Sequence, residues 1–229
     1  MRLDKFICKS TPLGRPEALR LIHAGAIQVN GRVIRDESTQ VHENNRIIFE
    51  GAQLRARASR YLMLHKPAAT VCSNIDEAYP SLLNCLALDQ ACALHIAGRL
   101  DADTTGLVLA TDDGRWSYAV FHPQQRCEKV YRVGLRDPLA GGVAPAFARG
   151  IRLAGEQGLT LPAKLQRVGP KEVLLTLTEG KFHQVKRMFA SVGNRVVSLH
   201  RERIGAVGLD IGLGQWRHLS AAEVASFCQ

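Results

Sequence analysis

Hydrophobic and polar positions in the first 58 residues predict two short helices followed by a small sheet. Apolar residues recur at helical spacing in residues 3–7 and 18–22, and Gly25 provides a natural end for the second helix. Residues 26–34 then hold two short apolar segments around an Asn-Gly dipeptide, which favours a tight hairpin because both residues tolerate positive φ. Residues 51–60 are basic and lack a strong apolar period, so we expect a linker there.

After this linker the pattern changes to short apolar runs of strand length with a few helical segments between them. Strands are predicted at residues 60–64, 70–73, 94–97, 107–111, 130–135, 164–168, 172–177 and 195–201. Helices are predicted at residues 114–121, 138–149 and 182–192, with a capped C-terminal helix that begins after Ser220. Because strands and helices do not alternate strictly, the pattern favours an α+β fold over a doubly wound parallel sheet. We therefore predict two domains, at residues 1–58 and 59–229.

The segment Gly98-Arg99-Leu100-Asp101-Ala102-Asp103-Thr104-Thr105-Gly106-Leu107 is the most informative part of the chain. It combines a basic side chain, two carboxylates, two hydroxyls and two glycines between two apolar runs. Such a segment is typical of a turn that leaves a sheet, where a rigid scaffold can present side chains to a ligand. Taken alone, however, the segment is better explained as an Asp- and Thr-rich turn held by local hydrogen bonds.

Composition adds a prediction about partners. With 229 residues, of which 46% are hydrophobic, the chain can bury a sizeable core. Residues 1–60 hold 11 Lys and Arg against 6 Asp and Glu, whereas the remaining residues hold 19 against 15. This asymmetry indicates that the N-terminal part binds a polyanion, while charge that serves only solubility would not be concentrated there.

Cysteine spacing and hydropathy exclude several classes of protein. The six cysteines include no Cys-x-x-Cys pair, which predicts buried free thiols and no zinc site. No apolar run approaches 18 residues, and charged residues interrupt the early apolar stretch, so neither a membrane span nor a secretory signal is expected. These features predict a cytoplasmic protein.

Four segments resemble, in the same order, the motifs of the pseudouridine synthases of ribosomal and transfer RNA. The central motif is the segment at residues 98–107, and the others are Leu64-His65-Lys66-Pro67, Glu128–Val133 and Glu179–Met188. The resemblance covers nearly all of the chain and is greatest to the type that acts on small-subunit (16S) ribosomal RNA. Two positions near the first motif depart from the family, with His65 in place of Asn and Ala69 in place of Gly.

The resemblance implies an architecture and an activity. The N-terminal domain would have the alpha-L RNA-binding fold of a small-subunit ribosomal protein. The catalytic domain would be a mixed, largely antiparallel β-sheet with flanking helices. The protein would isomerise one uridine of small-subunit ribosomal RNA to pseudouridine during ribosome biogenesis. Its partner would be this RNA, either naked or in a partly assembled particle, and we expect a monomer.

The reaction requires few chemical groups. Pseudouridine forms when the uracil N1–C1′ bond breaks, the base turns and a C5–C1′ bond forms, so no cofactor and no metal are expected. One carboxylate can serve, either by attacking C1′ or by taking the C2′ proton. The resemblance places this carboxylate at Asp101, its basic partner at Lys186 and a tyrosine that stacks on the flipped uracil at Tyr131.

Basic side chains are expected to contact the RNA. Arg99 could fill the gap left by the flipped nucleotide or hold a phosphate, although an ion pair with Asp103 or Asp113 would also explain it. Phosphate contacts give affinity and orientation but no sequence choice. The predicted RNA-binding residues are Arg15, Arg20, His23, Arg32, Arg35, Lys66 and Arg187.

Two functions from other classes remain open at this point. A metal-dependent phosphoryl-transfer enzyme could use the carboxylates of Asp101, Asp103, Asp112 and Asp113 to hold Mg²⁺. The chain has no phosphate-binding Gly-Lys loop to accompany them. A non-catalytic assembly factor could bind ribosomal RNA through the N-terminal domain alone. Uridine conversion in the presence of a chelator would distinguish all three functions.

Overall fold

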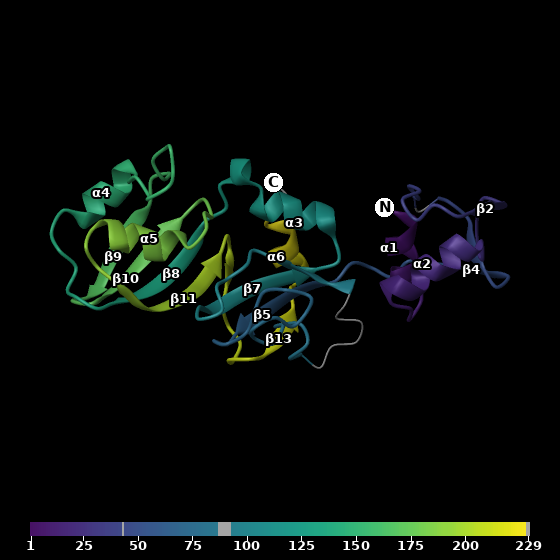
Figure 1. Ribbon diagram of the computed structural model, residues 1–229, viewed down its shortest axis with the longest axis horizontal. Helices are drawn as coiled ribbons and strands as arrows, with labels where there is room; N and C mark the ends of the chain where they lie inside the picture. Colours follow the sequence, from purple (N-terminus) through teal and green to yellow (C-terminus); the bar gives the residue numbers. More distant parts are fainter. Residues whose placement is uncertain (43, 87–92, 228–229) are drawn as a thin grey trace. The chain divides into compact units, whose positions relative to one another are not determined.

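The computed structural model describes residues 1–42, 44–86 and 93–227 (Figure 1). These residues form two compact units. The first contains the described residues up to 59 together with residues 93–94, and the second contains the remainder. The boundary lies between residues 59 and 60, one position after the boundary predicted from the sequence.

The N-terminal unit contains two helices and a four-stranded antiparallel sheet. Its strand order is β2-β1-β3-β4, and the hairpin between β1 and β2 turns at Asn30 and Gly31, whose φ angles are 51° and 81°. Both predicted helices and the predicted hairpin are confirmed, whereas β3 and β4 were not predicted. The elements are α1 (Leu3–Ser10), α2 (Arg15–Ala24), β1 (Ile27–Val29), β2 (Arg32–Ile34), β3 (Ile47–Phe49) and β4 (Ala52–Gln53).

The prediction of a linker at residues 51–60 is wrong for its first half. Strand β4 pairs with β3, and Leu54 and Ala56 pack against the core of the N-terminal unit. The Arg57 N–H also donates a hydrogen bond to the carbonyl of Lys9, at 3.1 Å. A two-residue strand has too few positions to show a period, so sequence patterning could not detect it.

The second unit is built on a nine-stranded mixed sheet. Its main path runs β13-β5-β7-β11-β8-β10-β9, with β6 paired to β7 and β12 paired to β11. Strands β7 and β11 run parallel, and the other described pairs in this sheet are antiparallel, as predicted. The strands are β5 (Tyr61–Lys66), β6 (His95–Ala97), β7 (Thr105–Thr111), β8 (Lys129–Leu135), β9 (Lys164–Gly169), β10 (Glu172–Leu177), β11 (Val196–Ile204), β12 (Val207–Gly208) and β13 (Trp216–His218).

The residues that precede the helices of the second unit determine where these helices begin. Asp113 caps α3 by accepting hydrogen bonds from two backbone N–H groups, and Ser220 with Glu223 forms the predicted capping box of α6. Helix α4 begins later than predicted because the preceding Gly142 takes a left-handed conformation with φ 85°. The helical elements are α3 (Gly114–Phe121), the 3₁₀ turn η2 (Pro123–Gln125), α4 (Val143–Arg149), α5 (Gln184–Ser191) and α6 (Ala221–Ala225).

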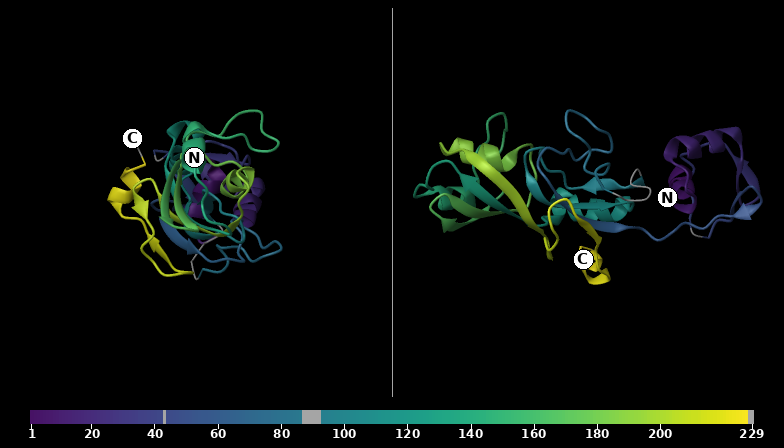
Figure 2. Two further views of the ribbon diagram at one scale, coloured as in Figure 1. Left: turned by 90° about the vertical axis from the view of Figure 1, so that its left-hand side faces the viewer. Right: turned by 90° about the horizontal axis from the view of Figure 1, so that it is seen from below.

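Two hydrophobic cores lie along this sheet. One joins α4 and α5 to β8, β10 and β11, and the other joins α3 to β5 and β7 (Figure 1, Figure 2). In β8 the side chains of Tyr131, Val133 and Leu135 are buried in the first core, while those of the alternate residues face the other side of the sheet. The turn that carries Asp101 connects β6 to β7.

Three further expectations can be compared with the structure. Residues 70–73 do not form the predicted strand, and only Val71 makes an isolated bridge, with Ser81. Cys72 is buried, but Cys85 is exposed, while Cys92 and Cys228 lie outside the described residues. No helix in the described part of the chain is long and apolar enough to cross a membrane.

Candidate active site

The Asp101 turn sits where two parallel strands approach closely. The Thr104 N–H donates a hydrogen bond to the carbonyl of Asp101, at 3.1 Å, which closes the turn. Gly106 lies opposite Arg201 of β11 and has φ 114°. A Cβ atom on Gly106 would collide with the backbone of Arg201, so only glycine allows this approach.

The buried guanidinium of Arg201 holds both ends of this turn. Its side chain is 1% exposed, and it donates hydrogen bonds to the carbonyls of Gly98, at 2.6 Å, and Leu107, at 2.7 Å. A third nitrogen lies 3.5 Å from the hydroxyl of Tyr131. Arg201 was not among the residues predicted from the sequence, because nothing in an alternating strand pattern shows which arginine turns inward.

Lys66 supports the same turn from the other side. Its ammonium is fully buried and donates to the carbonyls of Pro67 (3.0 Å), Ala102 (3.2 Å) and Thr104 (2.9 Å). Burial lowers the pKa of Lys66. The expectation that Lys66 contacts RNA is therefore not supported, since its charge is enclosed by protein carbonyls.

The two departures in the first motif have different consequences. Ala69 takes a left-handed conformation with φ 58°, and its N–H donates to the carbonyl of Ala102 at 2.9 Å. His65 precedes Lys66 on β5, so its side chain points to the opposite face of the sheet. There its Nδ1 lies 2.9 Å from the carbonyl oxygen of Ile211 and its ring makes an edge contact with His200.

Asp101 meets Lys186 of α5. The Lys186 Nζ donates to Oδ2 of Asp101 at 3.0 Å and to Oδ1 of Asp103 at 2.6 Å. Although partial burial opposes it, these two hydrogen bonds raise the pKa of Lys186. The hydrogen bond from Lys186 also lowers the pKa of Asp103. The side chains of Asp101 and Lys186 are each 29% exposed, so the ion pair is sheltered but still open to a ligand.

Tyr131 belongs to the same neighbourhood. Its side chain is 8% exposed within the core that α5 covers, and Leu100, which precedes Asp101, packs against that core. The Arg201 guanidinium lies over the Tyr131 ring, 5.9 Å from its centroid. The turn, the tyrosine strand and the lysine helix thus converge on one side of the sheet.

The other two predicted arginines occupy different environments. Arg187 is partly exposed, with 25% of its side chain accessible; it pairs with Glu156 at 3.2 Å and donates to the carbonyls of Phe182 and Ala154. Its role as an RNA contact stays a prediction, and these protein groups already bind its guanidinium. Arg99 is exposed. Among the described residues it forms neither of the ion pairs considered for it, with Asp103 or Asp113.

The carboxylates considered as a metal site serve separate structural roles. Asp112 pairs with Arg60 at 3.2 Å, and Asp113 caps α3 and accepts a hydrogen bond from the Tyr61 hydroxyl at 2.8 Å. Neither is grouped with Asp101 in a set of three metal-ligating side chains in the part of the chain that the structure describes. This donor arrangement does not resemble the oxygen cage that Mg²⁺ requires.

The five basic residues predicted in the N-terminal unit are all exposed, namely Arg15, Arg20, His23, Arg32 and Arg35. Some also make local contacts. Arg15 lies 3.3 Å from Asp4, and His23 lies 2.8 Å from Glu37. Arg35 donates to the carbonyl of His23 at 2.8 Å. Their exposed charges remain accessible to a polyanion.

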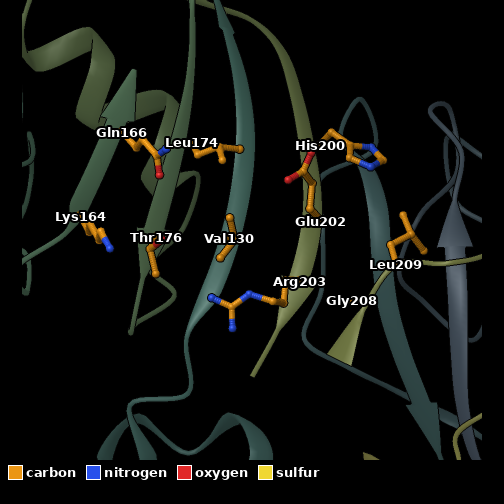
Figure 3. Close-up of a pocket in the computed structure, with 10 residues that line it drawn as sticks. All are labelled: Val130, Lys164, Gln166, Leu174, Thr176, His200, Glu202, Arg203, Gly208 and Leu209. Carbon is orange, nitrogen blue, oxygen red and sulfur yellow. The ribbon is translucent and has the colours of Figure 1, made fainter. Parts of the chain in front are cut away.

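A separate hollow of about 580 Å³ lies on the opposite face of the sheet, across β8 to β11 (Figure 3). Two of its charged side chains pair with neighbours, since Glu202 binds Arg132 and Arg203 binds Glu128. Such paired charges are typical of the solvent-facing side of an antiparallel sheet. The hollow is not lined by Asp101, Tyr131 or Lys186.

Comparison with known proteins places this geometry in a family. The family model of RNA pseudouridylate synthase matches residues 60–191, which include Asp101, Tyr131 and Lys186. The chain belongs to the RNA pseudouridine synthase family. Residues 1–47 match the S4 domain, in agreement with the ribosomal-protein-like fold expected for the N-terminal unit.

Relatives in this family are similar over the whole chain. The ribosomal small subunit pseudouridine synthase A of Vibrio cholerae is 47% identical over 228 residues, and that of Escherichia coli K12 is 46% identical over 229 residues. Each comparison covers 99% of both chains. A crystal structure of a pseudouridylate synthase is also similar, with a TM-score of 0.73, 43% identity and 99% of both chains covered. The protein is therefore a pseudouridine synthase, which is an isomerase.

Proposed function

We propose that this protein converts one uridine of small-subunit ribosomal RNA to pseudouridine, with Asp101 as the catalytic carboxylate. The ion pair of Asp101 with Lys186, at 3.0 Å, is the observation that carries this proposal. Asp101 lies on a turn whose backbone carbonyls accept buried hydrogen bonds from Arg201 and Lys66. A rigid support of this kind fixes the position of a reacting group before the substrate arrives.

Each residue has a distinct role in the proposed reaction. The N1–C1′ bond of the uridine breaks as Asp101 attacks C1′ or removes the C2′ proton, and uracil leaves as an anion. The base turns, and C5 bonds to C1′ as the Asp101–C1′ bond breaks or as Asp101 returns the proton to C2′. The C5 proton then passes to water and N1 gains a proton. Lys186 supplies positive charge beside the carboxylate, and the Tyr131 ring offers a face on which the uracil stacks. No step consumes an oxidant or a reductant.

The substrate follows from the relatives and the N-terminal unit. The similar proteins are named for the ribosomal small subunit, and this chain matches them from end to end. The exposed basic residues of the S4 domain suit binding to RNA phosphates. A uridine must leave its stack to expose C1′, and a loop or bulge makes this least costly. We place the protein in the cytoplasm as a monomer that acts on ribosomal RNA, either naked or partly assembled.

Tritium release tests this function. Formation of the C5–C1′ bond expels the C5 hydrogen, so RNA made with [5-³H]uridine should release tritium when it is incubated with the protein. Small-subunit RNA, naked or bound to ribosomal proteins, should release tritium, whereas large-subunit RNA should not. RNA that is annealed first should still react in EDTA when spermidine replaces Mg²⁺. Binding without tritium release would indicate an assembly factor, and strict recovery by Mg²⁺ would indicate metal chemistry.

A further inference from the structure

An aromatic pair stands exposed beside Asp101. The Phe182 side chain is 76% exposed, and its ring stacks on the imidazole of His183 with 3.8 Å between the ring centroids and 21° between the planes. The Nε2 atom of His183 lies 3.5 Å from Oδ1 of Asp101. Single exposed apolar side chains are common on protein surfaces. Phe182, however, has the highest exposed fraction of the large hydrophobic residues in the described part of the chain, and its neighbour His183 lies beside Asp101.

The polypeptide around this pair is held firmly. Gln184 is 4% exposed, accepts a hydrogen bond from the Lys181 N–H at 2.8 Å and donates to Glu179 at 2.6 Å. Arg187 donates to the Phe182 carbonyl at 3.0 Å and pairs with Glu156. The backbone on both sides of the Phe182 ring is therefore fixed by polar contacts.

The Phe182 ring does not contribute to the contacts that fix this backbone. None of the hydrophobic clusters in the described part of the chain includes Phe182. His183 holds a left-handed conformation with φ 47°, which is uncommon for a residue other than glycine. Such strain persists only where the surrounding structure enforces it, and it is concentrated at functional sites.

We propose that Phe182 and His183 form a stacking platform for an unpaired base that neighbours the target uridine. This inference rests on the proposed function and adds a second contact to it. When the uridine flips out, its neighbour loses a stacking partner, and an aromatic face beside Asp101 replaces that partner. Every base has a flat face, so the platform contributes affinity and position without reading sequence.

Phe182→Leu tests the platform because leucine keeps an apolar side chain but removes the aromatic face. With a small-subunit RNA fragment that the wild-type protein converts, we expect KM to rise roughly tenfold, the loss of one base-stacking contact, while kcat changes little. Phe182→Tyr keeps the aromatic face and should retain a low KM. Tyr118→Leu is the matched control, because Tyr118 is also exposed (65%) and also contacts a histidine ring, that of His122 at the C-terminal end of α3.

Photocrosslinking gives a readout that a merely structural role would not change. RNA with a single 5-iodocytidine on either side of the target uridine should crosslink to Phe182 or His183 under ultraviolet light, and Phe182→Leu should lose the product at residue 182. The proposal is overturned if KM and the crosslink are unchanged in Phe182→Leu, or if kcat falls with KM unchanged. Wild-type protein that crosslinks at Phe182 but converts no uridine would contradict the proposed function and leave the platform intact.

Discussion

Lys186 donates a hydrogen bond to Asp101 across 85 positions of sequence, at 3.0 Å. The two residues come from different elements, the first turn of α5 and the turn between β6 and β7. Both side chains are partly sheltered, so this ion pair gains more from its geometry than one exposed to bulk water. Tyr131 of β8 lies in the core against which Leu100, the residue before Asp101, packs.

Replacing Lys186 with methionine should lower the rate of conversion roughly 100-fold or more, because Asp101 loses its cationic partner. Lys186→Arg should recover part of this loss. Arg187→Met should reduce the rate much less and act mainly on thermal stability, since Arg187 holds backbone carbonyls near α5. Single-turnover rates at saturating RNA measure these effects, and the opposite order for the two methionine variants would contradict the assignment.

Tyr131→Phe should stay within a few-fold of the wild-type rate. The phenylalanine keeps the face on which uracil would stack, and within the described residues the Tyr131 hydroxyl makes only a long contact with Arg201, at 3.5 Å. Tyr131→Leu should be far slower because it removes that face. If Tyr131→Phe is inactive and its pH profile loses one limb, then the hydroxyl transfers a proton and stacking is not its main role.

Ala69→Gly should stabilise the protein by up to about 1 kcal/mol, because Ala69 holds a left-handed conformation that glycine adopts without strain. The matched control is Ala68→Gly, since Ala68 is not among the residues with positive φ. That change should destabilise by about 0.5 to 1 kcal/mol through the entropy of the unfolded chain. Urea unfolding compares the two variants. A less stable Ala69→Gly protein would show that other contacts dominate at this turn.

Removing residues 1–59 should leave a folded catalytic unit, since the two units have separate cores. Circular dichroism would test the fold. The truncated protein should bind small-subunit RNA more weakly, with a flatter dependence of log affinity on log salt, because fewer counterions are released. A full-length variant with Arg15, Arg20 and Arg32 changed to alanine should show the same flattening. Unchanged affinity and slope in both proteins would rule out docking through this unit.

The sequence was sufficient for the fold class and for much of the site. Short motifs selected Asp101, Lys186 and Tyr131 as candidates, and the structure places them on a turn, a helix and a strand of one unit. The sequence could not identify Arg201. Whether an arginine on a strand points inward depends on which backbone carbonyls the tertiary fold brings close to its guanidinium. Lys66 and Arg187 were predicted to contact RNA because they are basic, and the sequence could not show that both donate hydrogen bonds to backbone carbonyls.

The environment of Phe182 and His183 could not be predicted from the sequence either. The third motif contains both residues, and helical patterning predicted a helix from residue 182, whereas α5 begins at Gln184. Sequence patterning cannot tell that the Phe182 ring is exposed while Gln184 beside it is buried. That difference follows from the left-handed turn at His183, which a periodic pattern does not encode.

Conversion of uridine by Asp101→Asn protein tests the central claim most directly. Asparagine keeps the shape of the side chain and can still approach Lys186, but it lacks the charge needed to attack C1′ or remove a proton. We predict a fall in single-turnover rate of at least roughly 1,000-fold, with RNA affinity changed only a few-fold and the melting temperature close to that of the wild type. Asp103→Asn should retain most of its activity, because Asp103 is largely exposed and shares only the hydrogen bond from Lys186. A wild-type rate in Asp101→Asn, or a loss confined to Asp103→Asn, would contradict this account.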